Sequence, residues 1–147
     1  AGLDCAILIC QNKEFMKKIK SARRGIVGGV NVLGSTAAIA AYQYGQPWLK
    51  EILGYLQDNR DYLHEFILMN LPGISMRPPD ATYLAWLNCE ALNLPQEPYD
   101  HFLLNAKVGL NRGSEFGGDG KAFVRLNFGC TRETLTEALE RIKKSLE

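Results

Sequence analysis

The sequence has 147 residues and a mass of 16.4 kDa, which is the usual size of one domain. It is 46% hydrophobic and 22% charged with 14 Gly and 6 Pro, a globular profile that excludes collagen-like and low-complexity classes. The formal net charge is +1, so the charge pattern favours neither nucleic acid nor an anionic membrane surface as a partner.

The apolar runs and the cysteines indicate the cellular compartment in which the protein is expected. Residues 6–10 and 37–41 form the longest apolar runs, far short of the roughly 20 residues that a membrane helix needs. No basic segment precedes an apolar stretch near the start, so no signal peptide is predicted. The cysteines show neither C-x-x-C pairs nor a histidine at metal-ligand spacing, which predicts reduced, mostly buried thiols, no metal site and a cytoplasmic protein. These cysteines are Cys5, Cys10, Cys89 and Cys130.

The first third of the chain predicts one strand and two helices. The apolar run 5–10 is typical of a strand buried on both faces. Residues 13–24 have helical spacing of apolar side chains, and Asn12 is the expected N-cap. The Ala-rich segment 31–44 predicts a helix that is buried or lies at an interface.

A small sheet covered by helices is predicted for the remainder. A long helix over 48–69 begins after Pro47, and the last helix is capped by Thr131. Between them, periodicity and turn residues predict four strands and one further helix. The strands are expected at 74–77, 82–87, 108–110 and 122–128, and the helix at 98–107. The order α-β-β-α-β-β-α places the chain in the α/β class.

Arg125 is the strongest candidate for chemistry. It interrupts an apolar strand, and strand alternation places it on the same face as Phe123 and Asn127. A buried guanidinium is costly unless it meets an anion, and its planar fork suits a carboxylate. Two interpretations follow, a structural ion pair with an acidic side chain of the chain or a site for an anionic ligand.

The glycine-rich segment 113–120 also has two interpretations. It matches neither a Walker A motif nor a dinucleotide fingerprint. It is either a flexible connection between strands or a loop whose backbone passes close to a ligand. The two histidines, His64 and His101, have no ligand or catalytic partner at helical spacing and are expected to be surface or partly buried residues.

Six short motifs follow one another between Gly45 and Asn127. They are Gly45-Gln-Pro-Trp-Leu49, Tyr55-Leu-x-x-Asn-Arg60, Leu71-Pro-Gly73, Ala81-Thr-Tyr-Leu-Ala-Trp-Leu87, Gly113-x-x-Phe-Gly117 and Phe123-Val-Arg-Leu-Asn127. In this order they resemble the C-terminal part of the class I/II aminotransferases, which are pyridoxal-phosphate enzymes of fold type I. Within that family the chain is most similar to the MalY/PatB-like branch of cystathionine β-lyases.

The resemblance implies domains and site residues. Residues 1–46 correspond to the C-terminal edge of the large cofactor domain, and residues 47–147 to the small domain with its long linking helix. Arg125 matches the arginine that binds the substrate α-carboxylate, and Asn127 supports it. The segment 113–117 matches a loop that lines the mouth of the active site.

The resemblance also implies an activity for the complete enzyme. Its cofactor is pyridoxal 5′-phosphate, its substrate is an amino acid, and it acts as a C–S β-lyase or an aminotransferase, as a homodimer. The lysine that forms the Schiff base lies upstream of Ala1 in this family, so the chain is expected to be a C-terminal portion that is inactive alone. The alternative is a stand-alone, non-catalytic domain for binding or regulatory interaction.

Overall fold

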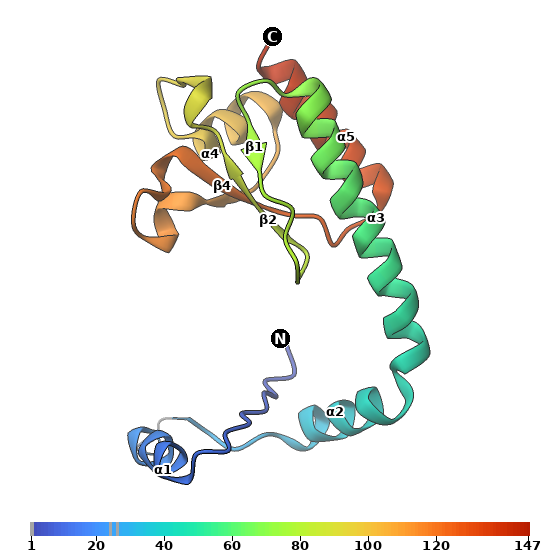
Figure 1. Ribbon diagram of the computed structural model, residues 1–147, viewed down its shortest axis with the longest axis vertical. Coiled ribbons are helices and arrows are strands. Elements are labelled where there is room, and N and C mark those ends of the chain that lie inside the picture. The colour runs from blue at the N-terminus through green and yellow to red at the C-terminus, as the bar shows by residue number, and fades with distance from the viewer. Residues whose placement is uncertain (1, 24, 26) are drawn as a thin grey trace. The chain divides into compact units, whose positions relative to one another are not determined.

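A computed structural model describes residues 2–23, 25 and 27–147 (Figure 1). It consists of two compact units, one ending at Glu51 and the other comprising Ile52–Glu147. The helices are α1 (Lys13–Ala22), α2 (Val32–Tyr44), α3 (Gln46–Asn70), α4 (Pro98–His101) and α5 (Arg132–Ser145). The strands are β1 (Ser75–Met76), β2 (Leu84–Asn88), β3 (Asn111–Arg112) and β4 (Phe123–Asn127).

The second unit is built on a four-stranded antiparallel sheet of order β1-β2-β4-β3. The central pair is β2 and β4, in which Trp86 is opposite Arg125. On the other edge of β4, Arg125 is opposite Asn111 of β3. The predicted α/β class and small sheet with helices are confirmed.

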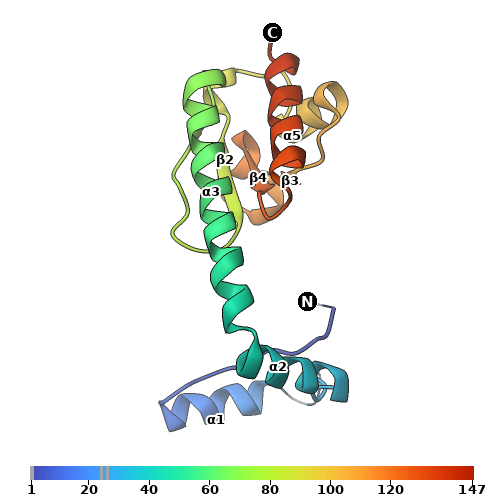
Figure 2. The same ribbon diagram turned by 90° about the vertical axis from the view of Figure 1, so that its right-hand side faces the viewer.

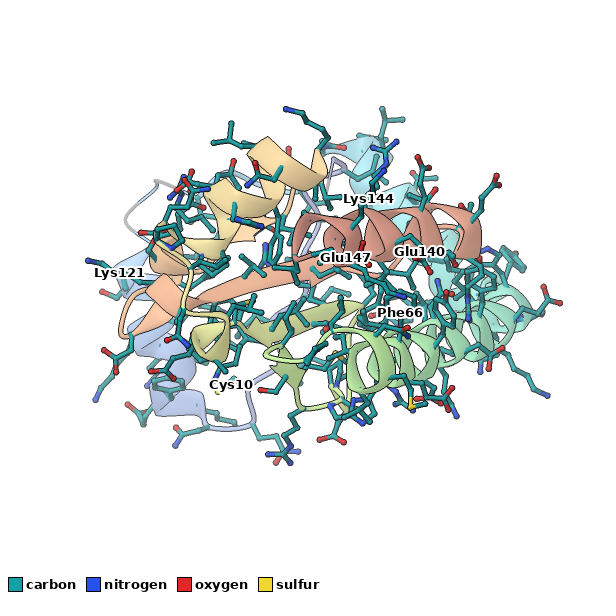
Figure 3. All side chains as sticks on the ribbon, turned by 90° about the horizontal axis from the view of Figure 1, so that it is seen from above. Cys10, Phe66, Lys121, Glu140, Lys144 and Glu147 are labelled. Carbon is teal, nitrogen blue, oxygen red and sulfur yellow. The ribbon has the colours of Figure 1, made fainter. Side chains whose placement is uncertain are left out.

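One face of this sheet carries the core. Val124 and Leu126 of β4 are buried, whereas the residues between and beside them are not, as expected for alternation along a strand. Figures 1 and 2 show α3 and α5 side by side over this face, and Figure 3 shows Phe66 between the two helices. The fully buried core side chains are Leu63, Ile67, Leu71, Ala85, Leu87, Phe102, Val124, Leu126, Phe128, Leu135, Leu139 and Ile142.

The two covering helices begin and pack as their sequences predict. Thr131 caps α5 by accepting a hydrogen bond from the Thr134 backbone N–H, 3.3 Å away. The apolar stripe of α5 is buried at Leu135, Leu139 and Ile142, as the helical spacing indicates. The predicted helix 48–69 is confirmed as α3, which starts two residues earlier.

A buried asparagine joins α3 to the segment that follows β4. Asn59 is fully buried, and its Nδ2 donates to the carbonyls of Phe128 and Cys130 at 3.0 and 2.9 Å. Its Oδ1 accepts a hydrogen bond of 2.9 Å from Nε of Arg132, whose guanidinium lies over the ring of Tyr62. All polar atoms of the Asn59 amide group are therefore used in holding the chain just beyond β4.

Two sequence predictions between the strands were wrong in detail. The helix expected over 98–107 is one turn of α4 followed by the π-helix η2 (Phe102–Ala106), which ends at Lys107 in a left-handed conformation. The strand expected at 108–110 is absent because the Val108 N–H closes η2 by donating to the Phe102 carbonyl at 3.1 Å. Strand pairing begins only at Asn111.

The first unit has its predicted helices but little buried surface. Asn12 and Asn31 cap α1 and α2 through their side chains. The predicted end of the first helix at Arg24 lies outside the described residues. The Ala-rich helix is not buried in this chain, because only Gly34 of α2 is buried; the other expectation, that this helix lies at an interface, stays a prediction.

The strand predicted over residues 5–10 was also wrong. The described structure assigns no strand there, and Ile7, Leu8 and Ile9 are exposed. A strand needs a neighbouring strand to accept its backbone hydrogen bonds, and no strand is described in this unit. The apolar pattern alone therefore predicted buried side chains, whereas Ile7, Leu8 and Ile9 are exposed because no neighbouring strand is described in this unit.

The thiols are free, and they are less buried than predicted. All four cysteines are free, but Cys89 alone is buried and the other three are half-buried. Burial raises the pKa of the Cys89 thiol to about 12 and also raises that of Cys130. Among the helices that the structure describes, none has the length and apolar run required to cross a bilayer.

Candidate functional site

The sheet face opposite the core presents an arginine among aromatic side chains. Because Val124 and Leu126 point into the core, Arg125 must point to the other face. Trp86, opposite Arg125 on β2, stacks on Phe123 with ring centroids 5.5 Å apart. The antiparallel register thus brings a cation and two aromatic rings together on one surface.

Arg125 is held by an amide and an aromatic ring. The Oδ1 of Asn111 accepts from Nε at 3.3 Å and from Nη2 at 3.2 Å, and Cζ lies 4.5 Å from the ring centroid of Phe116. The arginine is half-buried rather than buried, which corrects the sequence prediction; its guanidinium lies on the open face of the sheet, where solvent reaches it.

No carboxylate neutralises Arg125 in the part of the chain that the structure describes. The ion pairs found there within 4.0 Å involve Arg60, Arg112, Arg141 and Lys17. The interpretation of Arg125 as a structural ion pair therefore has no support among these residues. The geometry provides a fixed guanidinium whose remaining N–H groups, among the residues described, are available to bind an anionic ligand.

Asn127 lies on the same strand face, at the end of β4. It is exposed, and its Oδ1 accepts a 2.8 Å hydrogen bond from the backbone N–H of Gly129, which shapes the turn beyond the strand. Both predicted site residues, Arg125 and Asn127, border a pocket of about 380 Å³ that is also lined by residues 107–111 and by α5. The charged side chains that line this pocket with Arg125 are Lys107, Glu137 and Arg141.

The glycine-rich segment is a tightly built loop. It contains two 3-10 turns, η3 (Gly113–Phe116) and η4 (Gly120–Ala122). A Cβ on Gly113 would lie 2.2 Å from the carbonyl oxygen of Gly120, so the backbones at the base of the loop touch. The close approach that the glycines permit is thus between two parts of the loop itself.

An ion-pair cluster fixes the start of this loop. Arg112 pairs with Asp100 through both terminal nitrogens, at 2.8 and 2.5 Å, and with Glu97 at 3.0 Å. The same Glu97 carboxylate accepts a hydrogen bond of 3.0 Å from Ser114. The hydrogen bonds from Arg112 hold the pKa of Asp100 below its usual value, and the two carboxylates raise the pKa of Arg112.

The sequence pattern pointed to Arg125 and Asn127 and missed the residues that position them. The contribution of Asn111 depends on strand pairing, which was expected three residues too early. Phe116 and Asn59 appeared only as members of the motifs Gly113-x-x-Phe-Gly117 and Tyr55-Leu-x-x-Asn-Arg60, with no role assigned to either. The position of Asn59 on the buried stripe of α3, four residues before Leu63, was the signal that its amide is buried.

The histidines take no part in this site. His64 lies on α3 and His101 on α4, and both are half-buried as predicted. His101 contacts the Ser145 carbonyl through Nε2 at 3.0 Å. Side chains that could ligate a metal do not gather in groups of three or more among the residues described.

The chain matches one family model and many curated and solved proteins. The model described as aminotransferase class I and II matches residues 1–142. The chain is 39% identical to cystathionine beta-lyase PatB of Bacillus subtilis (strain 168), over 99% of the chain and 38% of that protein. It is 37% identical to cystathionine beta-lyase of Corynebacterium glutamicum, over 99% of the chain and 39% of that protein.

A solved relative has the same fold. The PLP-bound C-S lyase from Staphylococcus hominis superposes with a TM-score of 0.81 at 30% identity, over 94% of this chain and 36% of that one. The chain therefore spans well under half the length of these relatives. The motif resemblance is confirmed, and the chain belongs to the class I and II aminotransferase family.

Proposed function

We propose that this chain supplies the substrate α-carboxylate site of a pyridoxal-phosphate-dependent enzyme that acts on amino acids. The observation that carries the proposal is Arg125, which is fixed on the open face of the sheet with no carboxylate partner among the described side chains. Asn127, at the end of the same strand, shapes the rim of the site through its bond to Gly129. Both residues belong to the motif Phe123-Val-Arg-Leu-Asn127.

For the complete enzyme we favour a C–S β-lyase over an aminotransferase. Two curated relatives, at 39% and 37% identity, carry the name cystathionine beta-lyase, and the relative from Staphylococcus hominis is a PLP-bound C-S lyase. In this arrangement residues 1–46 form the edge of the large cofactor domain and residues 47–147 the small domain. We further propose that the complete enzyme is a cytoplasmic homodimer.

The residues of this chain do not themselves fit the cofactor's covalent site. A lysine that forms a Schiff base is activated by burial or by a neighbouring cation, which lowers its pKa. None of the nine lysines is buried; Lys143 is half-buried against Asn70, and the others, Lys107 beside the pocket included, are exposed. We therefore assign the cofactor to the remainder of the enzyme and expect the chain alone to be inactive.

The role of Arg125 is to bind and orient the substrate. A bidentate pair with the α-carboxylate fixes the substrate in one orientation. Such positioning decides which bond at Cα is set for cleavage, and the cofactor, when bound, supplies the electron sink for that cleavage.

The proposal is tested with variants of Arg125 in the complete enzyme. With S-ethyl-L-cysteine as substrate, Arg125→Gln should lower kcat/KM by about 100-fold or more, since it removes a charged bidentate pair. Arg125→Lys should recover only part of the loss, because an ammonium cannot form the two parallel hydrogen bonds. Arg77→Gln, a change at an exposed arginine, is the matched control and should leave kcat/KM unchanged.

Two outcomes would contradict the proposal. Equal kcat/KM for Arg125→Gln and the parent enzyme would remove Arg125 from the substrate site. A stable Schiff-base absorbance band from residues 1–147 alone, after addition of pyridoxal phosphate, would show that this chain holds the cofactor covalently. Release of ethanethiol without an added 2-oxo acid identifies the lyase, whereas conversion of an added 2-oxo acid to its amino acid, with the C–S bond of the substrate kept in the 2-oxo acid product, identifies the aminotransferase.

A further inference from the structure

The guanidinium of Arg125 is engaged along only one of its edges. Asn111 lies directly opposite on β3, and its Oδ1 accepts from Nε and Nη2. An arginine side chain has five N–H groups, and this contact uses one from each of these two nitrogens. The remaining N–H of Nη2 and both of Nη1 make no hydrogen bond to any of the described residues.

An aromatic ring restricts the guanidinium on a second side. Phe116 lies with its ring centroid 4.5 Å from Cζ of Arg125, a cation–π distance. The ring of Trp86 meets Phe116 edge to face at 5.5 Å, so Phe116 is itself supported. Phe116 is nevertheless 50% exposed, which leaves the guanidinium open to solvent beside it.

The loop that carries Phe116 is anchored at its base. Ser114 donates to Glu97, and the backbones of Gly113 and Gly120 are in contact. Asn111 is held by strand pairing at the other end of the same short segment. Both contacts to Arg125 therefore come from positions with little freedom to move.

We propose that Asn111 and Phe116 are positioning residues that present the Nη1–Nη2 edge of Arg125 to the substrate α-carboxylate. The proposal rests on the proposed function of Arg125. A carboxylate binds that edge through two parallel hydrogen bonds, which is the pairing that an arginine fork permits. A neutral amide is suited to the opposite edge because it orients the guanidinium without cancelling its charge.

The isosteric variant Asn111→Asp tests the charge of the Arg125 guanidinium separately from its orientation. An aspartate in this place keeps the shape and the accepting oxygen but neutralises Arg125. Binding of a substrate carboxylate should weaken, while binding of a neutral analogue should not. A residue with a merely structural role would weaken both equally or neither.

The measurement is kcat/KM of the complete enzyme for S-ethyl-L-cysteine and for its α-carboxamide. The parent enzyme should prefer the acid, and Asn111→Asp should reduce the acid-to-amide ratio by roughly tenfold, the size of one charge-assisted hydrogen bond. Phe116→Leu, which keeps an apolar side chain but removes the ring, should reduce the ratio by roughly threefold. Asn105→Asp, the same change at an exposed asparagine bonded to His101, is the control and should leave the ratio unchanged.

The outcomes distinguish this inference from the proposed function. If Arg125→Gln collapses the acid-to-amide ratio but Asn111→Asp and Phe116→Leu do not, the positioning role is wrong and the carboxylate site stands. If Arg125→Gln leaves the ratio unchanged, the proposed function itself fails. If Asn111→Asp does not fold, as judged by thermal unfolding, the ratio in Phe116→Leu decides the inference.

Discussion

The two units of the chain use similar proportions of apolar residues in different ways. In Ile52–Glu147, apolar side chains from strands β2 and β4 and from helices α3, η2 and α5 fill one core, and Leu139 is 0% exposed. In the unit that ends at Glu51, an equally aliphatic helix, α2, keeps Ile39 57% exposed and buries only Gly34. Hydrophobic periodicity therefore predicted the helices in both units but predicted burial correctly in only one.

The difference shows where the stability and the site of this chain reside. The second unit contains a closed core, a buried polar anchor at Asn59 and the surface that carries Arg125. Truncations of buried side chains are costly because they leave cavities, whereas truncations of exposed ones cost little. Matched substitutions in the two units test this contrast.

The largest difference is expected between Leu139→Ala and Ile39→Ala in the 147-residue chain. Leu139→Ala should lower the free energy of unfolding by about 2–5 kcal/mol through loss of buried surface and creation of a cavity. Ile39→Ala, which also shortens an aliphatic side chain on a helix, should change it by about 0.5 kcal/mol or less. Urea unfolding followed by tryptophan fluorescence measures both, and equal losses would contradict the contrast.

The next effect concerns the two asparagines that fix helices. Asn59→Ala should cost about 3 kcal/mol, because it leaves two carbonyls and the Arg132 guanidinium without their partner. Asn31→Ala removes the cap of α2 and an exposed hydrogen bond to the Leu3 carbonyl, and it should cost about 1 kcal/mol or less. The same unfolding experiment measures the ranking, and a larger cost for Asn31→Ala would overturn it.

Alkaline pH should destabilise the second unit through Cys89. Burial raises the pKa of its thiol from 9.0 to about 12, so the folded state favours the protonated form. This contribution is fully present below pH 9 and is lost as the pH rises through the folded-state value. Stability measured from about pH 8 to about pH 11 should decline less in Cys89→Ala than in the parent, whereas Cys10→Ala should follow the parent. Identical profiles for all three proteins would exclude this role of Cys89.

The smallest effect is expected at acid pH, from Asp100. Hydrogen bonds from Arg112 lower the pKa of this carboxyl below its ordinary value of 3.8. Its contribution to stability is present above that ordinary value and is lost as the pH falls through the lower folded-state pKa. Asp100→Asn should make the acid-unfolding curve shallower, and Asp58→Asn, at an exposed carboxylate, should not. An acid-unfolding curve for Asp100→Asn that matches that of the parent would show that solvent screens the ion pair between Asp100 and Arg112, and that this pair does not stabilise the folded state.

The elements that were predicted well depend on local signals. Asn12, Asn31 and Thr131 cap helices because a short polar side chain reaches the free N–H groups of the first turn. The register of β4 against β2 and β3, by contrast, is a property of the folded chain, and the pairing of β3 with β4 produces the contact between Arg125 and Asn111. The apolar strand around Arg125 and the six ordered motifs led to Arg125 and Asn127 but carried no information on the hydrogen bonds that hold either residue.

The errors arose where a local pattern has two physical outcomes. The apolar run 5–10 has the composition of a buried strand, but pairing requires a second strand, which this unit does not contain among its described residues. Val108 is apolar and buried like a strand residue, yet its N–H closes the π-helix η2. Arg125 in an apolar strand suggested burial, whereas the sheet has a core on only one of its faces.

A crystal structure of the complete enzyme with a bound amino-acid inhibitor tests the central claim most directly. We predict that the inhibitor's α-carboxylate lies against the Nη1 and Nη2 atoms of Arg125, with two N–O distances of about 2.7–2.9 Å, while Asn111 keeps its contact to Nε. A carboxylate bound to another cation, with Arg125 left facing solvent, would contradict the account.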